Sequence, residues 1–342
     1  MTDVLRNNWF VVLIAVIIIC FIGYFIYDTN KDNVSAKSSN NEQVVASINK
    51  DDITAKDLYD ESAPYDGSTI YNMYKNAVVD QSIETTKDLK KQANTLEANI
   101  KSNASKQSDD YESTLTSELA KYGYSSFDDL NDYCLTSVKE KEMNKRYITK
   151  HFEDLKTAWE TKSPRTVSII KMDVSDADNL TETETKKKSN IETALTKESF
   201  ADVAKAFSED SNTANKKGFA GYIDTDSTTS TSSSSNSTVP AAVATAAISL
   251  QKGDTSDWIT VTTSSGTSLY KVYVKETDSS KIFNAKNDAV ANQALYAILN
   301  SDSSLSYKIL KSYAKKLDIK FNDKSTKKKF DSYVETTYGG DQ

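Results

Sequence analysis

Few side chains in this sequence are of the kinds that carry out covalent or metal chemistry. Its 342 residues contain one histidine, His151, and two cysteines, Cys20 and Cys134. A Ser-His-Asp triad on any other histidine and a multi-histidine zinc site are therefore excluded. We expect His151 to be a partly exposed structural residue of a helix and Cys134 to be a small buried hydrophobe. No cofactor and no metal ion is expected.

One acidic residue stands where it could take part in chemistry. Asp210 lies in the segment FADVAKAFSEDSNTANKKGFAGY (200–222), which is typical of an amphipathic helix followed by an acidic turn, a polar stretch and a glycine pair. Asp210 could be the polar group of a working site. An aspartate in a Ser-Glu-Asp-Ser sequence is, however, more often a cap or a turn former. Both interpretations stay open here.

The N-terminus carries a long apolar segment. Residues 9–27, WFVVLIAVIIICFIGYFIY, are uncharged, and at about 1.5 Å per residue they are just long enough to cross a hydrocarbon core of about 30 Å. A cleaved signal peptide is the alternative, but its apolar region is usually shorter. Ile19 disfavours lipid attachment at Cys20, because such signals have a small residue there. The sequence predicts an uncleaved single-pass anchor.

Composition limits the partners and the compartment. A net charge of −7 and the lack of a basic, aromatic-rich block argue against a nucleic-acid partner. Beyond the anchor Cys134 is the only cysteine, so no intramolecular disulfide can form there. Such a low cysteine content is typical either of a cytoplasmic protein or of the cysteine-poor exterior proteins of Gram-positive bacteria.

The first half of the chain is predicted to be mainly helical. Residues 28–42 form a polar spacer, and a short strand over 44–48 is followed by a turn and by a helix that Thr54 begins. Apolar residues at helical spacing then predict long helices from about 68 to 159, one of them ended by Gly123. These helices cannot bury all their apolar faces alone.

The second half alternates strands and helices. Pro164 breaks the helical pattern, and 165–174 reads as a strand. A helix over 181–194, the segment 200–222, a low-complexity loop over 225–238, a short helix, a β-hairpin and C-terminal helices complete the predicted order.

Three stretches in this order resemble PrsA-type extracellular foldases, which carry a parvulin-type peptidyl-prolyl isomerase domain. VVASINKDDITAKDLYDE is similar to the opening of PrsA and SurA-like chaperones. FADVAKAFSEDSNTANKKGFAGYI and VPAAVATAAISLQKGDTSDWITVTTSSGTSLYKVYVKE are similar to the centre and end of a parvulin domain. Together they span nearly the whole chain.

The resemblance implies a site whose residues are mostly replaced. The two family histidines align with Ser168 and Ser268, and the family Cys/Asp position is kept as Asp210. Val239 and Val243 stand where Met and Phe line the family's proline pocket, and they lack an aromatic face. The isomerase scaffold is therefore expected to be kept while its catalytic cluster is degenerate.

We expect an α+β fold in which a helical chaperone domain, formed by both ends of the chain, carries an inserted parvulin-like module. The predicted division is residues 1–27 (cytoplasmic stub and anchor), 28–43 (linker), 44–163 (helical, N-terminal part), 164–278 (parvulin-like), 279–335 (helical, C-terminal part) and 336–342 (tail). Insertion would supply the first helices with their missing packing partners.

The expected function is that of a membrane-anchored extracytoplasmic chaperone for unfolded or nascent secreted proteins. Its 19 tyrosines are expected to pack between helices, or else to grip unfolded chains. The C-terminal part would be extracellular, and a homodimer through the helical domain is a further expectation. An active peptidyl-prolyl isomerase and a structural or adhesive surface protein are the alternatives.

Overall fold

The computed structural model describes residues 38–39, 42–48, 51–54, 65–229, 239–317 and 319–339. They belong to two compact units, residues 1–66 and 67–342, which are described separately. The anchor predicted over 9–27 lies outside the described residues. Within the described ranges, no helix combines the length and the apolar character that a membrane crossing requires.

The first unit contains a small antiparallel sheet with the order β1-β2-β3. Its strands are β1 (Ser38–Ser39), β2 (Glu42–Ile48) and β3 (Asp51–Thr54). The strand predicted over 44–48 is confirmed as part of β2. Strand β1 and the start of β2 lie within the stretch expected to be a spacer. Thr54, expected to cap the start of a helix, pairs with Val44 as the last residue of β3, and the helix predicted after it lies outside the described residues.

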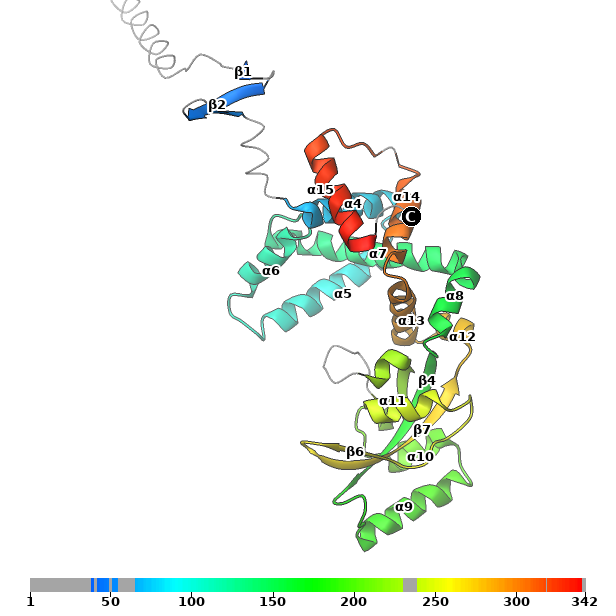
Figure 1. Ribbon diagram of the computed structural model, residues 1–342. Coiled ribbons are helices and arrows are strands. Elements are labelled where there is room, and N and C mark those ends of the chain that lie inside the picture. Colours follow the sequence, from blue (N-terminus) through cyan, green and yellow to red (C-terminus); the bar gives the residue numbers. More distant parts are fainter. Residues whose placement is uncertain are drawn as a thin grey trace, which may run out of the picture. The chain divides into compact units, whose positions relative to one another are not determined.

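The second unit is mainly helical, with one four-stranded sheet, and the expected α+β class is confirmed (Figure 1). Its N-terminal helices are α4 (Gly67–Ser82), α5 (Lys87–Ala104), α6 (Tyr111–Ala120), α7 (Leu130–Lys150) and α8 (Phe152–Glu160). Its C-terminal helices are α12 (Ser279–Phe283), α13 (Asp288–Ser301), α14 (Leu305–Ala314) and α15 (Lys324–Tyr338).

Helices from both ends of the second unit share one hydrophobic core. Buried residues of α4 and α7, such as Val78 and Ile148, belong to the same cluster as Ile309 of α14 and Phe330 of α15. Helix α15 lies along α4, as Figure 1 shows. The early helices therefore find part of their apolar cover about 200 residues further along the chain.

In the sequence, a compact α/β segment lies between these two sets of helices. Its antiparallel sheet has the order β5-β4-β7-β6, formed by β4 (Arg165–Val174), β5 (Phe219–Ile223), β6 (Ile259–Thr263) and β7 (Gly266–Glu276). Its helices are α9 (Glu182–Leu195), α10 (Phe200–Phe207) and α11 (Ala241–Ile248), with short 3-10 turns η2 (Ala214–Lys216) and η3 (Thr225–Thr228). We call residues 165–276 the module.

Most elements of the module match their predicted ranges, with one correction. The strand over 165–174 is confirmed as β4, and the helix over 181–194 as α9. The loop predicted from 225 instead begins with η3. Its first turn forms because the Asp224 carboxylate accepts hydrogen bonds from the backbone N–H groups of Asp226 and Ser227, at 3.0 and 3.3 Å.

The sheet of the module is covered on both faces. On one face Val167 and Ile169 belong to a cluster with α11, and on the other Ile170 and Met172 belong to a cluster with α9 and α10. Alternate residues of β4 therefore point to opposite faces, as a strand requires. The same alternation decides which polar side chains of β4 and β7 can meet.

A buried hydrogen-bonded chain joins the module to α8. The Trp159 indole N–H donates to the Tyr222 hydroxyl at 2.9 Å, and that hydroxyl donates to the Asp224 carboxylate at 2.8 Å. All three side chains are buried. Burial, with the charge of Asp224 adding to it, raises the pKa of Tyr222, so this hydroxyl stays protonated and available as a donor.

Gly218 permits a close approach of α10, β4 and the start of β5. Its φ is +75°, and a Cβ added there would lie 2.6 Å from the Ala204 Cβ and 2.7 Å from the Ile169 carbonyl oxygen. The Gly218 carbonyl also accepts a hydrogen bond from the Ile169 N–H, at 2.8 Å. Only glycine fits both the backbone angle and the space.

Replacing this glycine should destabilise the module. Gly218→Ala combines a left-handed backbone penalty with an overlap against backbone atoms, so we expect a loss of about 3 kcal/mol in the free energy of unfolding. Gly253→Ala is the matched control, because Gly253 has φ +94° but nothing within 4 Å of an added Cβ. It should cost only about 1 kcal/mol. Urea denaturation measures both, and equal losses would contradict the packing argument.

Candidate functional site

The centre of the candidate site is a polar pair on the sheet face that α11 covers in part. Ser268 of β7 lies directly opposite Asp173 of β4. The Ser268 hydroxyl donates a hydrogen bond to the Asp173 carboxylate, with 2.7 Å between the oxygens. One of the two serines that replace a family histidine is therefore bonded to a carboxylate on the neighbouring strand.

Lys171 completes this cluster. It is two residues from Asp173 on β4, so the two side chains share a face, and its ammonium lies 2.9 Å from the Asp173 carboxylate. Burial would raise the pKa of Asp173, but the hydrogen bonds from Lys171 and Ser268 outweigh it and lower that pKa. The hydrogen bond to Asp173 raises the pKa of Lys171. At neutral pH both groups are charged.

Tyr270 and Asp210 border the same cluster. Burial raises the pKa of Tyr270, and the negative charges of Asp210 and Asp173 raise it further while Lys171 opposes them. Asp210 also contributes to the raised pKa of Lys171, after the larger effects of Asp173 and Tyr270. The fold thus places Asp210 within electrostatic reach of Lys171 and Tyr270.

The loop that carries Asp210 is fixed against the edge of β4. The Lys171 N–H donates to the Ser208 hydroxyl at 3.1 Å, and the Glu209 N–H donates to the Lys171 carbonyl at 2.9 Å. The Asp173 N–H donates to the Glu209 carboxylate at 2.7 Å. These bonds hold the acidic turn beside the strand that bears Lys171 and Asp173.

Asp210 itself forms a turn. Its carboxylate accepts a hydrogen bond from the Thr213 hydroxyl at 2.6 Å and from the Asn212 N–H at 3.3 Å. Its backbone carbonyl accepts from the N–H groups of Thr213 and Ala214. The structure therefore gives Asp210 the turn-forming contacts, which leaves its carboxylate largely occupied. Its catalytic role stays a prediction.

Ser168 does not lie near Ser268 and Asp173. It pairs with Tyr273 of β7, whereas Ser268 pairs with Asp173. Asp173 lies five positions after Ser168 on β4, which corresponds to about 16 Å along a strand. Ser168 is two residues from Ile170 on β4, so both side chains point to the face covered by α9 and α10. The two serines aligned with the family histidines thus lie on opposite faces of the sheet.

Val239 and Val243, the positions expected to line a proline pocket, are buried in the hydrophobic cluster between α11 and the sheet. Val243 is fully buried and Val239 is 5% exposed. Their cluster includes Tyr270 and Val272 of β7. Side chains with so little exposed surface cannot contact a substrate without rearrangement, so these valines are core residues in this structure.

A cavity of the module opens on the other sheet face. It measures about 390 Å³ and is lined by Glu192, Leu195, Phe200, Thr255, Ser256, Asp257, Lys271 and Tyr273. Phe200 and Tyr273 stack there, with 5.3 Å between their ring centres. None of the predicted site residues lines this cavity.

The tyrosines of the helical part pack mainly between helices. The Tyr71 ring centre lies 5.2 Å from that of Tyr333 and 6.1 Å from that of Phe330, which joins α4 to α15. A cavity of about 230 Å³ includes Tyr122 and Tyr133 in its lining. The packing interpretation is therefore confirmed for the core, and the cavity remains as a tyrosine-lined surface.

His151 and Cys134 have the structural settings that the sequence predicted. His151 lies half-buried between α7 and α8, with its ring centre 4.4 Å from that of Tyr147. Cys134 has no exposed surface, and burial raises the pKa of its thiol to about 11. Among the described residues, no group of three or more His, Cys, Asp or Glu side chains is placed to hold a metal ion.

The arrangement favours hydrogen bonding over proton transfer. General acid–base catalysis works best when the pKa of the catalytic group lies near the working pH. Here the pKa of Lys171 is raised and that of Asp173 is lowered, away from neutrality in both cases. The cluster can bind a polar backbone through its charges, and the two valines expected to line a proline pocket are buried.

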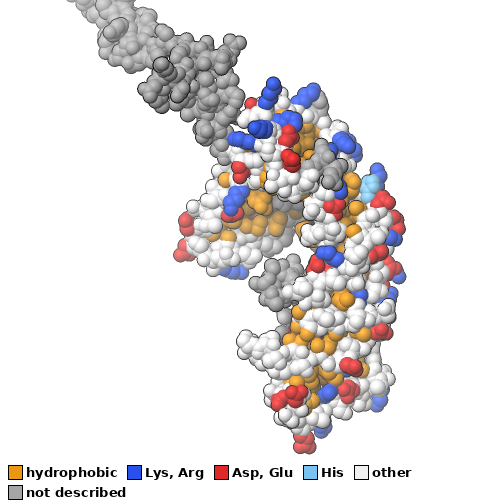
Figure 2. Space-filling view, in the orientation of Figure 1, with side chains coloured by type: hydrophobic (Ala, Val, Ile, Leu, Met, Phe, Trp, Pro, Cys, Tyr) orange, Lys and Arg blue, Asp and Glu red, His pale blue; other side chains and the backbone are white. Residues whose placement is uncertain are grey.

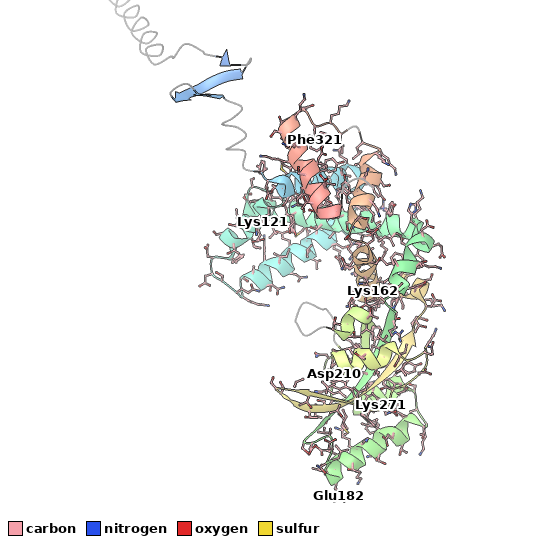
Figure 3. All side chains as sticks on the ribbon, in the orientation of Figure 1. Lys121, Lys162, Glu182, Asp210, Lys271 and Phe321 are labelled. Carbon is pink, nitrogen blue, oxygen red and sulfur yellow. The ribbon has the colours of Figure 1, made fainter. Side chains whose placement is uncertain are left out.

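Sequence reasoning missed Lys171, Asp173 and Tyr270. The signal was present in the strand alternation, because Lys171 and Asp173 are separated by one residue in a predicted strand, as are Ser268 and Tyr270. What the sequence did not contain is the register that places Asp173 opposite Ser268. Figure 3 labels Asp210, in the loop between α10 and η2, and Lys271, on the same strand as Ser268.

Comparisons with known proteins agree with the resemblance. Residues 169–273, about a third of the chain, match the rotamase family profile, described as the PPIC-type PPIASE domain. The foldase protein PrsA of Streptococcus sanguinis is 28% identical over 211 residues, which are 61% of this chain and 55% of that relative. The alignment therefore spans about half the length of that protein.

Solved structures of PrsA proteins are also similar. The PrsA structure from Bacillus subtilis is 22% identical and covers 84% of this chain and 97% of its own, with a TM-score of 0.41. That from Streptococcus pneumoniae is 20% identical and covers 86% and 99%, with a TM-score of 0.38. Scores this low support no argument about geometry. The resemblance to PrsA-type parvulin foldases is confirmed by the sequence matches.

The polar cluster yields a prediction on pH. Ser268→Ala removes one of the hydrogen bonds that lower the pKa of Asp173, so that pKa should rise toward its ordinary value. A carboxyl whose pKa is lower in the folded state stabilises the protein above its unfolded pKa, and this contribution is lost as the pH falls through the folded pKa. The variant should therefore show a smaller acid-induced loss of stability.

Carboxyl ¹³C NMR titration of Asp173, combined with denaturation at several pH values, measures both effects. Ser265→Ala is the control, because Ser265 is exposed in the β6–β7 turn. An Asp173 titration that is the same in all three proteins would show that the Ser268 hydrogen bond has no influence on this carboxylate.

Proposed function

We propose that this protein is a membrane-anchored extracytoplasmic chaperone that assists the folding of secreted proteins, and that its parvulin-like module has lost most or all isomerase activity. The proposed loss of isomerase activity rests on one observation, the burial of Val239 and Val243. Where the family would have an open proline pocket, this chain has a filled core. The polar cluster of Lys171, Asp173 and Ser268 is what remains beside it.

A filled pocket matters more for this reaction than the missing histidines do. Isomerisation of a prolyl bond crosses a barrier of roughly 18–20 kcal/mol without any covalent change, so catalysis depends on holding the twisted amide. Interactions accelerate a reaction only when they are stronger in the transition state. Without a recess for the proline ring, the module can bind a chain but has little means to favour the twisted form.

Chaperone activity is inferred from the relatives and from the helical part. The relative from Streptococcus sanguinis is named a foldase, and residues 169–273 of this chain match the PPIC-type PPIASE domain. Beyond that domain the second unit is a helical body whose cavity includes Tyr122 and Tyr133. Tyrosine rings at a cavity rim bind apolar side chains without demanding a particular sequence, which suits unfolded or nascent secreted proteins as partners.

The shared core supports the proposed domain division from α4 onward. We propose residues 44–163 and 279–335 as one helical chaperone domain and 164–278 as the inserted module, with a tail from 336 that α15 overlaps as far as Tyr338. The proposal is supported by a hydrophobic cluster that unites α4 with α15. A homodimer through the helical domain stays a prediction.

Location follows from the sequence of the N-terminus. The apolar segment 9–27 would cross the membrane once and place the C-terminal part outside the cell. An anchored chaperone meets its partners at the site of export at a high effective concentration, so weak and broad binding would be sufficient.

Prolyl isomerisation tests the degenerate site. We expect residues 43–342 to give no rate above background on a proline tetrapeptide, while the same protein suppresses aggregation of an unfolded client. Asp210→Ala should change neither result. A catalysed rate that falls in the Asp210→Ala variant would establish the alternative, an active isomerase. Failure to suppress aggregation of any client would favour a structural or adhesive surface protein.

Membrane extraction tests the anchor. The full chain expressed in a Gram-positive host should stay in the membrane fraction after alkaline carbonate and high salt, and external protease should digest residues beyond the anchor. Replacing Val16 and Ile17 with Asp should release the chain into the soluble fraction, because charged residues at the centre of a span are costly. Release of the unaltered chain by carbonate would rule out an integral anchor.

A further inference from the structure

The C-terminal part of the helical domain carries a concentration of positive charge. Residues 308–330 contain nine lysines and two aspartates, a formal charge of +7, in a chain whose net charge is −7. Charge of one sign gathered in one place creates a local field that favours an anionic partner. Neither the proposed chaperone activity nor the module uses these residues.

The lysines lie on an exposed surface formed by the end of α14, the connection to α15 and the first turns of α15. We call this the lysine surface; it consists of Lys315, Lys316, Lys320, Lys324, Lys327 and Lys328, all exposed. Within α15, Lys324, Lys327 and Lys328 have the spacing of one helix face and are exposed, while Phe330 and Val334, further along the helix, are buried. Figure 2 shows Lys and Arg side chains gathered over α15.

Neighbouring acidic groups neutralise little of this charge. Lys327 pairs with Asp331 at 2.5 Å, but both side chains are more than half exposed, and such pairs contribute little in water. Asp323 accepts a hydrogen bond from the Thr326 N–H at the start of α15, at 2.5 Å. With six lysines against Asp323 and Asp331, the described part of this surface keeps a net positive charge.

The chain enters the second unit directly beside α15. Gly67 begins α4, and a Cβ added to it would lie 2.6 Å from the Lys329 carbonyl oxygen and 2.9 Å from the Tyr333 Cβ. Only glycine allows the first turn of α4 to approach α15 so closely. The connection toward the apolar segment 9–27 thus leaves the unit at the same helix that carries half of the lysine surface.

We propose that the lysine surface binds the anionic headgroups of the membrane that holds the N-terminal segment. The inference rests on the proposed anchor. Residues 28–66 lie between the apolar segment and α4 and could span at most about 140 Å even when fully extended, so an anchored chain keeps α4 within that distance of the membrane. Clusters of lysines close to a membrane anchor bind anionic lipid electrostatically, and salt screens this attraction.

Lysine modification in vesicles tests the proposal with the full chain. We would reconstitute it in phosphatidylcholine vesicles with or without 30% phosphatidylglycerol and measure acetylation rates by mass spectrometry. Residues of the lysine surface should react at least threefold more slowly in the anionic vesicles, and 0.5 M NaCl should abolish the difference. Exposed lysines of the module, Lys186, Lys197 and Lys216, should react equally in both.

A matched pair of triple variants assigns the effect to this surface. Lys324→Gln, Lys327→Gln and Lys328→Gln together should remove most of the protection at Lys315, Lys316 and Lys320. The control, Lys186→Gln, Lys197→Gln and Lys216→Gln, changes the net charge equally and should leave the protection intact. Thermal unfolding of both variants checks that the exposed substitutions preserve the fold.

Three results would overturn the proposal. They are equal acetylation in the two kinds of vesicle, protection that persists in 0.5 M NaCl, and protection by inorganic polyphosphate in the absence of protection by anionic lipid, which would indicate a soluble polyanion as the partner. Carbonate extraction of the same vesicles reports separately on the anchor. A chain that stays anchored while its lysines react equally in both lipids refutes the lysine surface alone.

Discussion

The buried carboxylate of Asp224 is the constraint on which the junction of the two parts of the second unit depends. A charge removed from water must be satisfied by donors, and here they are the Tyr222 hydroxyl and the first N–H groups of η3. Trp159 of α8 donates in turn to Tyr222. One buried anion thus orders the edge of the sheet and ties it to the helical core. Arg165 adds hydrogen bonds to the Ala247 and Leu250 carbonyls, which fix α11 to the start of β4.

Local signals were enough to predict most helices and strands. Pro164 and the β-branched run after it marked β4, and helical spacing marked α4 and α5. The turn η3, where a loop was expected, has a tertiary cause. It forms because Asp224, buried by its contacts with Tyr222, also caps it. That burial is not visible to a local pattern.

The candidate site was less predictable because an alignment assigns identities but not faces or register. Ser168 and Ser268 align with the two family histidines, yet strand pairing separates them and places Asp173 opposite Ser268. The same limit applies to Val243, whose small size was evident from the sequence. Its complete burial depends on how α11 seats on the sheet. Residue type could therefore predict a weakened site, whereas the Lys171–Asp173–Ser268 cluster required the fold.

The shared helical core also determines the order in which this protein can fold as it is made. The sheet of the module uses only residues 165–276, so it can close as soon as that segment has emerged. Helices α4 and α7 must wait for α14 and α15, which are synthesised after the module, before Val78 and Tyr71 are covered. During its own synthesis the chain therefore displays the exposed apolar helices that are typical of an incompletely folded protein.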